Sequence, residues 1–183
     1  ITAVTRAAGF RKDGSLQYDE SILKGAGVKP NMMVDVTLGM MPLFFGNSMD
    51  AEELEQFKTS VSLAKSKGIA LVGIQTPFFD PLNEAVENEK RYGILRDFER
   101  QVRAGWLKKL GVHFFDFRTF HPFSGDYRYF IDVVHSTEPV FIAMLKHMVT
   151  DRDFSRLLPN LTAEKLGELL RKDKSASQHV HFF

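Results

Sequence analysis

The apolar positions of this chain fall into short runs that alternate with segments of helical periodicity. The runs cover residues 32–38, 69–75 and 112–117, and each is bounded by glycine, proline or polar residues. Short continuous apolar runs are typical of strands that a parallel sheet buries on both faces. Strands that alternate with helices predict β-α-β units. We therefore expect a single α/β domain over residues 1–183, a three-layer α/β/α sandwich with a mainly parallel sheet in which these three strands are adjacent or nearly so.

The segment before the run 69–75 predicts a helix over residues 51–66. Asp50 and Glu53 are spaced as a capping box, and Gly68 stands where such a helix would end. The apolar positions that repeat at helical spacing are Leu54, Phe57, Val61 and Ala64. This face of the helix should pack on the sheet.

A second helical region covers residues 82–110. Asp80 and Pro81 predict its start, with Asp80 as the cap and proline in the first turn. Gly93 predicts a break that divides the region into two helices, and Gly111 predicts its end.

The two ends of the chain carry weaker signals. Residues 4–10 and 16–18 could form a short hairpin around an Asp-Gly turn. Near the other end, Thr162 is placed to cap a last helix. Residues 172–183 are mostly polar and predict a flexible tail.

Composition excludes several classes of function. The chain has 44% hydrophobic residues, 26% charged residues and a formal net charge of +1, which is typical of a globular protein and gives no basic stripe for nucleic acid. The absence of cysteine excludes disulfides, thiolate metal sites and a cysteine nucleophile. No apolar run approaches the roughly 20 residues of a transmembrane helix, so we expect no membrane span.

The strongest chemical signal is Asp132-x-x-His135, which lies between an apolar segment and a predicted helix. A carboxylate that accepts the Nδ1–H bond of a histidine fixes its tautomer and leaves Nε2 free to take a proton from a hydroxyl. Ser136 or Thr137 could cap the following helix, with Pro139 in its first turn. The positive end of that helix would favour the neutral imidazole that a general base needs.

A structural role fits the same residues. Asp132 could simply end a strand, and His135 could be an ordinary hydrogen-bonded histidine near a helix start. The position of Asp132 and His135 in the chain favours a functional site, because binding and active sites in parallel sheets lie at the carboxyl ends of the strands. The segments that follow strand-like runs are Gly46-Asn47, Thr76-Pro77, the loop after Phe117, and Asp132 with His135. These segments could share one rim.

This order of segments resembles the later part of an SGNH (GDSL-type) hydrolase, in which an Asp-x-x-His box precedes the last helix. The chain is similar in particular to the branch found among bacterial envelope and exopolysaccharide proteins. In that branch an Arg-x-Asp-Gly-Ser-x-x-Tyr box precedes the helix-strand unit, as residues 11–18 do here. The resemblance covers roughly residues 9–149.

The resemblance implies an SGNH-hydrolase or flavodoxin-like sandwich and the hydrolysis or transfer of an acyl group, often acetyl, on an O-acylated carbohydrate or similar ester. His135 would be the base and Asp132 its orienting partner. Gly46 and Asn47 would contribute to the oxyanion site, although their spacing departs from the usual Gly-x-Asn. No cofactor is implied, and the location would be extracytoplasmic or associated with the envelope.

The catalytic serine of that family has no clear counterpart here. It belongs in a Gly-x-Ser box after the first strand, but the hydroxyl residues before position 13 are Thr2 and Thr5. Ser15 lies in the Asp-Gly turn, and Ser48 reads as a helix-start residue without a Gly-x-Ser-x-Gly elbow. We therefore expect a C-terminal part of a larger SGNH-like domain, with the serine outside it and little activity alone.

An aromatic-rich segment after the third predicted strand would flank the acyl group. Its candidate substrate residues are Phe120, His121, Phe123 and Tyr127. The same side chains could instead cover an edge of the core.

Two other functions remain open. The first is a non-catalytic module of the same fold that binds carbohydrate or protein at the aromatic segment. The second is a metal site built from His113, His121, His135 and Asp116, but these residues lack the close pair spacing of metal motifs. The close pair His179 and His181 lies on the expected tail. We expect no metal.

Overall fold

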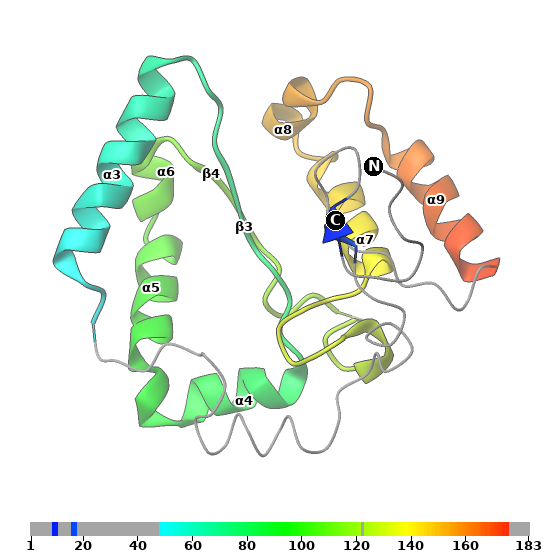
Figure 1. Ribbon diagram of the computed structural model, residues 1–183, viewed down its shortest axis with the longest axis horizontal. Coiled ribbons are helices and arrows are strands. Elements are labelled where there is room, and N and C mark those ends of the chain that lie inside the picture. Colours follow the sequence, from blue (N-terminus) through cyan, green and yellow to red (C-terminus); the bar gives the residue numbers. More distant parts are fainter. Residues whose placement is uncertain (1–8, 11–15, 18–47, 122, 176–183) are drawn as a thin grey trace.

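The computed structural model describes residues 9–10, 16–17, 48–121 and 123–175 (Figure 1). Helices and strands are mixed, and the central element is a parallel pair of strands, β3 (Val72–Gln75) and β4 (His113–Asp116). Both strands lie within the predicted runs 69–75 and 112–117, so their parallel pairing is confirmed. The predicted strand over residues 32–38 lies outside the described residues.

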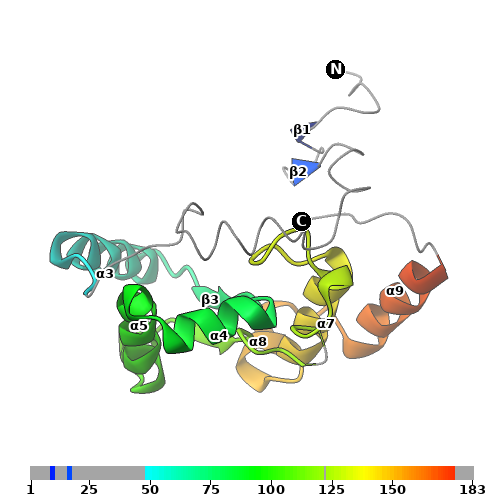
Figure 2. The same ribbon diagram turned by 90° about the horizontal axis from the view of Figure 1, so that it is seen from below.

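Helices lie on both sides of this pair. Figure 1 shows α3, α5 and α6 on one side of the strands and α7, α8 and α9 on the other, and Figure 2 shows the same division from below. The helical elements in chain order are α3 (Ala51–Ser66), α4 (Asp80–Asn88), the 3-10 turn η1 (Lys90–Tyr92), α5 (Gly93–Arg103), α6 (Trp106–Leu110), the 3-10 turn η2 (Tyr127–Tyr129), α7 (Glu138–Met148), α8 (Arg152–Leu157) and α9 (Ala163–Ser175).

Side chains along β4 alternate between two hydrophobic clusters. Phe114 packs with Leu107 of α6 and Val61 of α3, whereas Phe115 packs with Met144 of α7 and Phe154 of α8. Because successive residues of a strand point to opposite faces, each face of the pair contacts its own set of helices. Helices therefore cover both faces of the described sheet.

Helix α3 is the element that the sequence predicts best. Its bounds are those predicted, and Asp50 Oδ1 accepts hydrogen bonds from Glu52 N at 2.9 Å and Glu53 N at 3.1 Å. Gly68 ends the helix with a φ of +68°, a left-handed conformation that glycine adopts without steric cost.

The second helical region is divided near Gly93 as predicted, with η1 between α4 and α5. The expected cap is wrong, however. Phe79 occupies the N-cap position of α4, and Asp80 is already helical. A tertiary contact accounts for the shift, because Asp80 N donates to Ser124 O at 2.9 Å and fixes the chain at this point. Pro81 lies in the first turn, as expected.

The N-terminal hairpin is confirmed in short form. Strand β1 (Gly9–Phe10) pairs antiparallel with β2 (Leu16–Gln17). At the other end, Thr162 Oγ1 accepts a hydrogen bond from Lys165 N at 3.3 Å, so the predicted cap is present. Helix α9 continues to Ser175, which makes the first residues of the expected tail helical.

Helix α8 was not predicted. It is a short helix whose cap, Asp151, accepts hydrogen bonds from Asp153 N and Phe154 N, both at 2.9 Å. Within the described part of the chain, no helix has the length and apolar character needed to cross a membrane.

Candidate functional site at the Asp132–His135 turn

Asp132 and His135 form the predicted contact. His135 Nδ1 lies 2.6 Å from Asp132 Oδ2. The other carboxylate oxygen, Oδ1, accepts backbone hydrogen bonds from Val134 N and His135 N, each at 2.8 Å. The carboxylate is therefore fixed by three donors within its own turn, and it can orient the imidazole without help from another side chain.

The two side chains differ in exposure. The imidazole of His135 is 61% exposed, whereas the carboxylate of Asp132 is 18% exposed. Apolar side chains therefore do not enclose the imidazole, which is the condition that a base needs. Among the described residues, no hydroxyl donates to its Nε2.

The electrostatics of the pair favour charge on both partners. The hydrogen bond to Asp132 raises the pKa of His135 above its usual value, against the opposing effect of burial. Burial acts to raise the pKa of Asp132, but the hydrogen bonds from the imidazole and from the two backbone N–H groups outweigh it and lower that pKa. The helix start was expected to favour neutral imidazole, whereas the neighbouring carboxylate acts in the opposite direction.

Backbone hydrogen bonds close the turn at its base. Ile131 N donates to His135 O at 2.9 Å, and Thr137 N donates to Tyr129 O at 2.9 Å. The turn therefore holds its shape through its own backbone, and the next helix begins directly from it.

The cap of α7 differs from the prediction. Thr137 is at the N-cap position, but its hydroxyl makes no capping bond, and Pro139 lies in the first turn as expected. The hydroxyl oxygens of Ser136 and Thr137 are buried, and neither has a hydrogen-bond partner within the described residues. The chain therefore enters the helix with both hydroxyls buried, and Thr137 N donates to Tyr129 O.

Three of the four segments expected on the rim do meet there. Phe78 N, in the loop after β3, donates to Arg118 O in the loop after β4 at 3.1 Å. The next residue, Phe79, donates its N–H to Val133 O inside the Asp132–His135 turn at 3.0 Å. The turn therefore sits at the carboxyl ends of β3 and β4. Gly46 and Asn47, the oxyanion candidates, lie outside the described residues.

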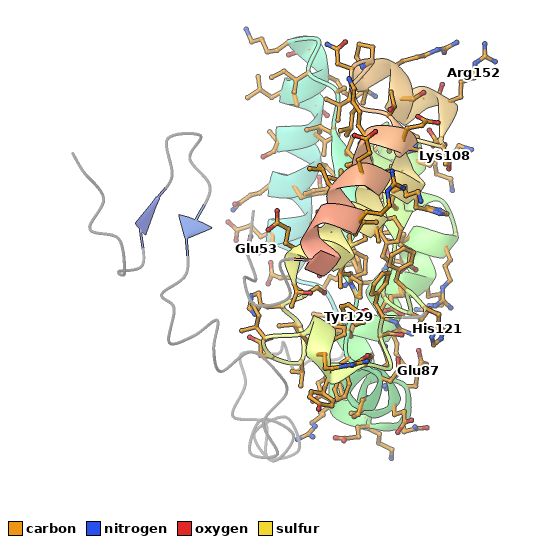
Figure 3. The ribbon with its side chains drawn as sticks, turned by 90° about the vertical axis from the view of Figure 1, so that its right-hand side faces the viewer. Glu53, Glu87, Lys108, His121, Tyr129 and Arg152 are labelled. Atoms are coloured by element: carbon orange, nitrogen blue, oxygen red, sulfur yellow. The ribbon has the colours of Figure 1, made fainter. Side chains whose placement is uncertain are left out.

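The aromatic segment is divided between the core and the surface. Phe120 and Phe123 pack against the cluster of Phe117 and α7. Tyr127 is 56% exposed, and His121 is exposed with Nδ1 3.4 Å from Ser124 Oγ (Figure 3). A role in substrate contact remains a prediction, and Tyr127 and His121 are the side chains open to a ligand.

A buried ion network next to the rim has no clear signal in the sequence. The side chain of Arg118 is 7% exposed, donates to Glu99 Oε1 at 2.5 Å and also bonds Glu87. The hydrogen bond from Arg118 lowers the pKa of Glu87, whereas burial raises the pKa of Glu99. Since Glu87 is on α4 and Glu99 on α5, this arginine ties both helices to the loop after β4.

An apolar groove of about 590 Å³ lies elsewhere, between α3, α5, α6 and one face of the strands. Leu54, Phe57, Trp106 and Phe114 line it, with the acids Asp50 and Glu53 at the start of α3. His135 is not part of its lining. Leu54, Phe57 and Val61, from the apolar face predicted for α3, all line it.

The described residues contain no group of three histidine, aspartate or glutamate side chains that could hold a metal ion. His113 instead has its Nε2 3.4 Å from Asp151 Oδ1. The site is a hydrogen-bonded Asp–His pair with an exposed imidazole.

Comparison with protein-family models, curated proteins and solved structures finds no match to this chain. The resemblance to SGNH hydrolases therefore rests on the motifs in the sequence.

Proposed function

We propose that this chain carries the Asp–His part of an SGNH-type serine esterase or acyl transferase that acts on an O-acylated carbohydrate or a similar ester. The observation that carries the proposal is the 2.6 Å contact between Asp132 Oδ2 and His135 Nδ1, with the imidazole exposed. Its place at the carboxyl ends of two parallel strands supports it, because sites collect there in α/β folds.

In the proposed reaction, a serine from outside the 183 residues attacks the acyl carbon while His135 Nε2 takes the hydroxyl proton. Asp132 accepts the Nδ1–H bond and stabilises the imidazolium that forms. The imidazolium then gives its proton to the leaving sugar oxygen, and the acyl group remains on the serine until water or an acceptor hydroxyl removes it. Donors at Gly46 and Asn47 would bind the oxyanion. The raised pKa of His135 makes its neutral imidazole a stronger base, although a smaller fraction of the imidazole is neutral.

We also propose that the described strands belong to a three-layer α/β/α sandwich with a larger, mainly parallel sheet. Helices on both faces of β3 and β4 support this architecture. The apolar run 32–38 would add a further parallel strand next to α3.

The test is hydrolysis of a small activated acyl ester. The 183-residue chain and its His135→Ala variant should give the same near-background rate, since triad members act as a unit. A chain extended with a segment that bears the serine should show a rate that His135→Ala abolishes. An extended chain that hydrolyses equally well with His135→Ala contradicts the proposal. Turnover by the 183-residue chain alone, lost in His135→Ala, would place the nucleophile within it, and Ser48 or Ser15 would be mutated first.

The same samples address the binding alternative. Measured affinity for an acylated oligosaccharide without turnover by the extended chain would favour a non-catalytic module.

A further inference from the structure

A buried amide joins the loops that carry the candidate site. Asn83 lies in the first half of α4 and is 7% exposed. Its Nδ2 donates to Phe78 O at 3.2 Å and to Arg118 O at 3.3 Å. A primary amide has two N–H donors, so one side chain binds the loop after β3 and the loop after β4 at the same time.

These loops lead directly to the Asp132–His135 turn. Phe78 N also donates to Arg118 O, and Phe79 N, one residue further, donates to Val133 O at 3.0 Å. The amide of Asn83 therefore fixes the residue that precedes the turn's backbone anchor. Any shift of Phe78 relative to Arg118 would move that anchor.

Apolar contacts reinforce the same link. Val133 is fully buried against Leu82 and Val86, the neighbours of Asn83 on α4. The ring of Phe79 lies 5.7 Å from that of Phe130, at the base of the turn. The turn is thus attached to the N-cap residue of α4 by a backbone hydrogen bond and a ring contact, and to α4 itself by the apolar contacts of Val133.

We infer that Asn83 is a positioning residue for His135, acting through the loops at Phe78 and Arg118 to hold the Asp132–His135 turn on the rim. The catalytic role of the oriented imidazole rests on the proposed function, whereas the positioning by Asn83 does not. Asn83 does not touch the reacting groups itself. It determines where His135 lies on the rim and how its imidazole is oriented toward a substrate.

The readout is the pKa of His135, measured by NMR from the pH dependence of its ring protons, with the signal assigned from a His135→Ala sample. Asn83→Ala should raise this pKa further, because a turn displaced from the rim loses part of the burial that opposes the effect of Asp132, while the bond to Asp132 stays within the turn. The matched control is Asn88→Ala on the same helix, where Nδ2 donates to Glu84 O at 2.9 Å at an exposed position. That variant should leave the pKa of His135 unchanged.

A folded Asn83→Ala protein with the wild-type pKa at His135 overturns the inference, even if its stability falls, because a purely structural amide would lower stability alone. If Asn83→Ala does not fold, Asn83→Ser takes its place. Its hydroxyl has one donor for the two carbonyls, and the same two outcomes decide. Neither measurement depends on ester turnover, so an inactive extended chain would count against the proposed function and leave this inference standing.

Discussion

Helices α3 and α4 differ in how well the sequence predicts their ends and in how deeply they are buried. Helix α3 has the bounds, the cap and the terminal glycine that the sequence predicts, yet Val61 is its one buried residue. Leu63 on α3 is 61% exposed. Helix α4 has no side-chain cap and begins one residue away from the expected position, yet Leu82 and Val86 are fully buried.

The difference separates two kinds of information. Capping residues and terminal glycines act within a few residues. They therefore determine where a helix begins and ends, but not which other elements pack on it. Burial depends on partners far away in the chain, and for α4 these are the loop after β4 and the Asp132–His135 turn. The rim therefore depends on tertiary contacts, whereas α3 depends mostly on local ones. Four experiments test this contrast.

The largest expected effect is at Arg118, the centre of the buried network. Arg118→Ala should lower the free energy of unfolding by about 3–5 kcal/mol, because it removes the close partner of Glu99, whose side chain is 13% exposed, and leaves it only the Arg103 guanidinium at 3.8 Å. The control is Arg100→Ala, whose side chain is 79% exposed beside Asp97 and should cost less than about 1 kcal/mol. Both values come from denaturant titration. Similar losses of unfolding free energy in the two variants would show that the buried Arg118–Glu99 pair stabilises the fold no more than an exposed pair does.

Next come matched leucines on the two helices. Leu82→Ala should cost about 2–5 kcal/mol, since it opens a cavity in a fully buried cluster. Leu63→Ala, at an exposed position, should change stability by less than about 0.5 kcal/mol. A loss at Leu63 as large as that at Leu82 would break the comparison, because it would mean that α3 is covered as tightly as α4.

The two acids at the helix starts give a smaller contrast. Asp50→Ala should cost about 1 kcal/mol, because it removes the side-chain bonds to Glu52 N and Glu53 N. Asp80→Ala should cost only a few tenths of a kcal/mol from the helix dipole, since Asp80 is not a cap. Thermal or denaturant unfolding of both variants checks the order. Equal losses of stability in the two variants would indicate that Asp80 caps α4 as Asp50 caps α3.

The smallest effect is the pH dependence of the Asp132–His135 pair. The lowered pKa of Asp132 gives stability above about pH 3.9 that is lost as pH falls through the folded value. The raised pKa of His135 gives stability below about pH 6.5 that is lost as pH rises through the folded value.

Wild type and Asp132→Asn should therefore differ most between these two pH values, by about 1 kcal/mol at most, because solvent screens the exposed imidazole. Unfolding curves across pH 3 to 9 measure this difference. A gap that does not change over the whole range would mean that the charges of the pair do not stabilise the fold.

Sequence could predict those features whose causes are local or periodic. The Asp132–His135 contact follows from a three-residue spacing, and the parallel pairing of β3 with β4 follows from two apolar runs separated by helices. The cap of α4 could not be predicted, because Ser124 O fixes Asp80 from outside the helix. The same holds for Arg118, whose partners on α4 and α5 come together only in the folded chain.

The register of the parallel strands also has a kinetic consequence. Val72 lies opposite His113, so pairing must close a loop of about 40 residues, and contacts of such long sequence separation form late in folding. The hydrogen bond between Asp132 and His135 spans one turn and needs no such closure. The dyad should form on its own early, and its place on the rim should come only with the sheet. Stopped-flow refolding should therefore show His135 ring signals changing before amide protection appears in β3, and the reverse order would contradict this sequence of events.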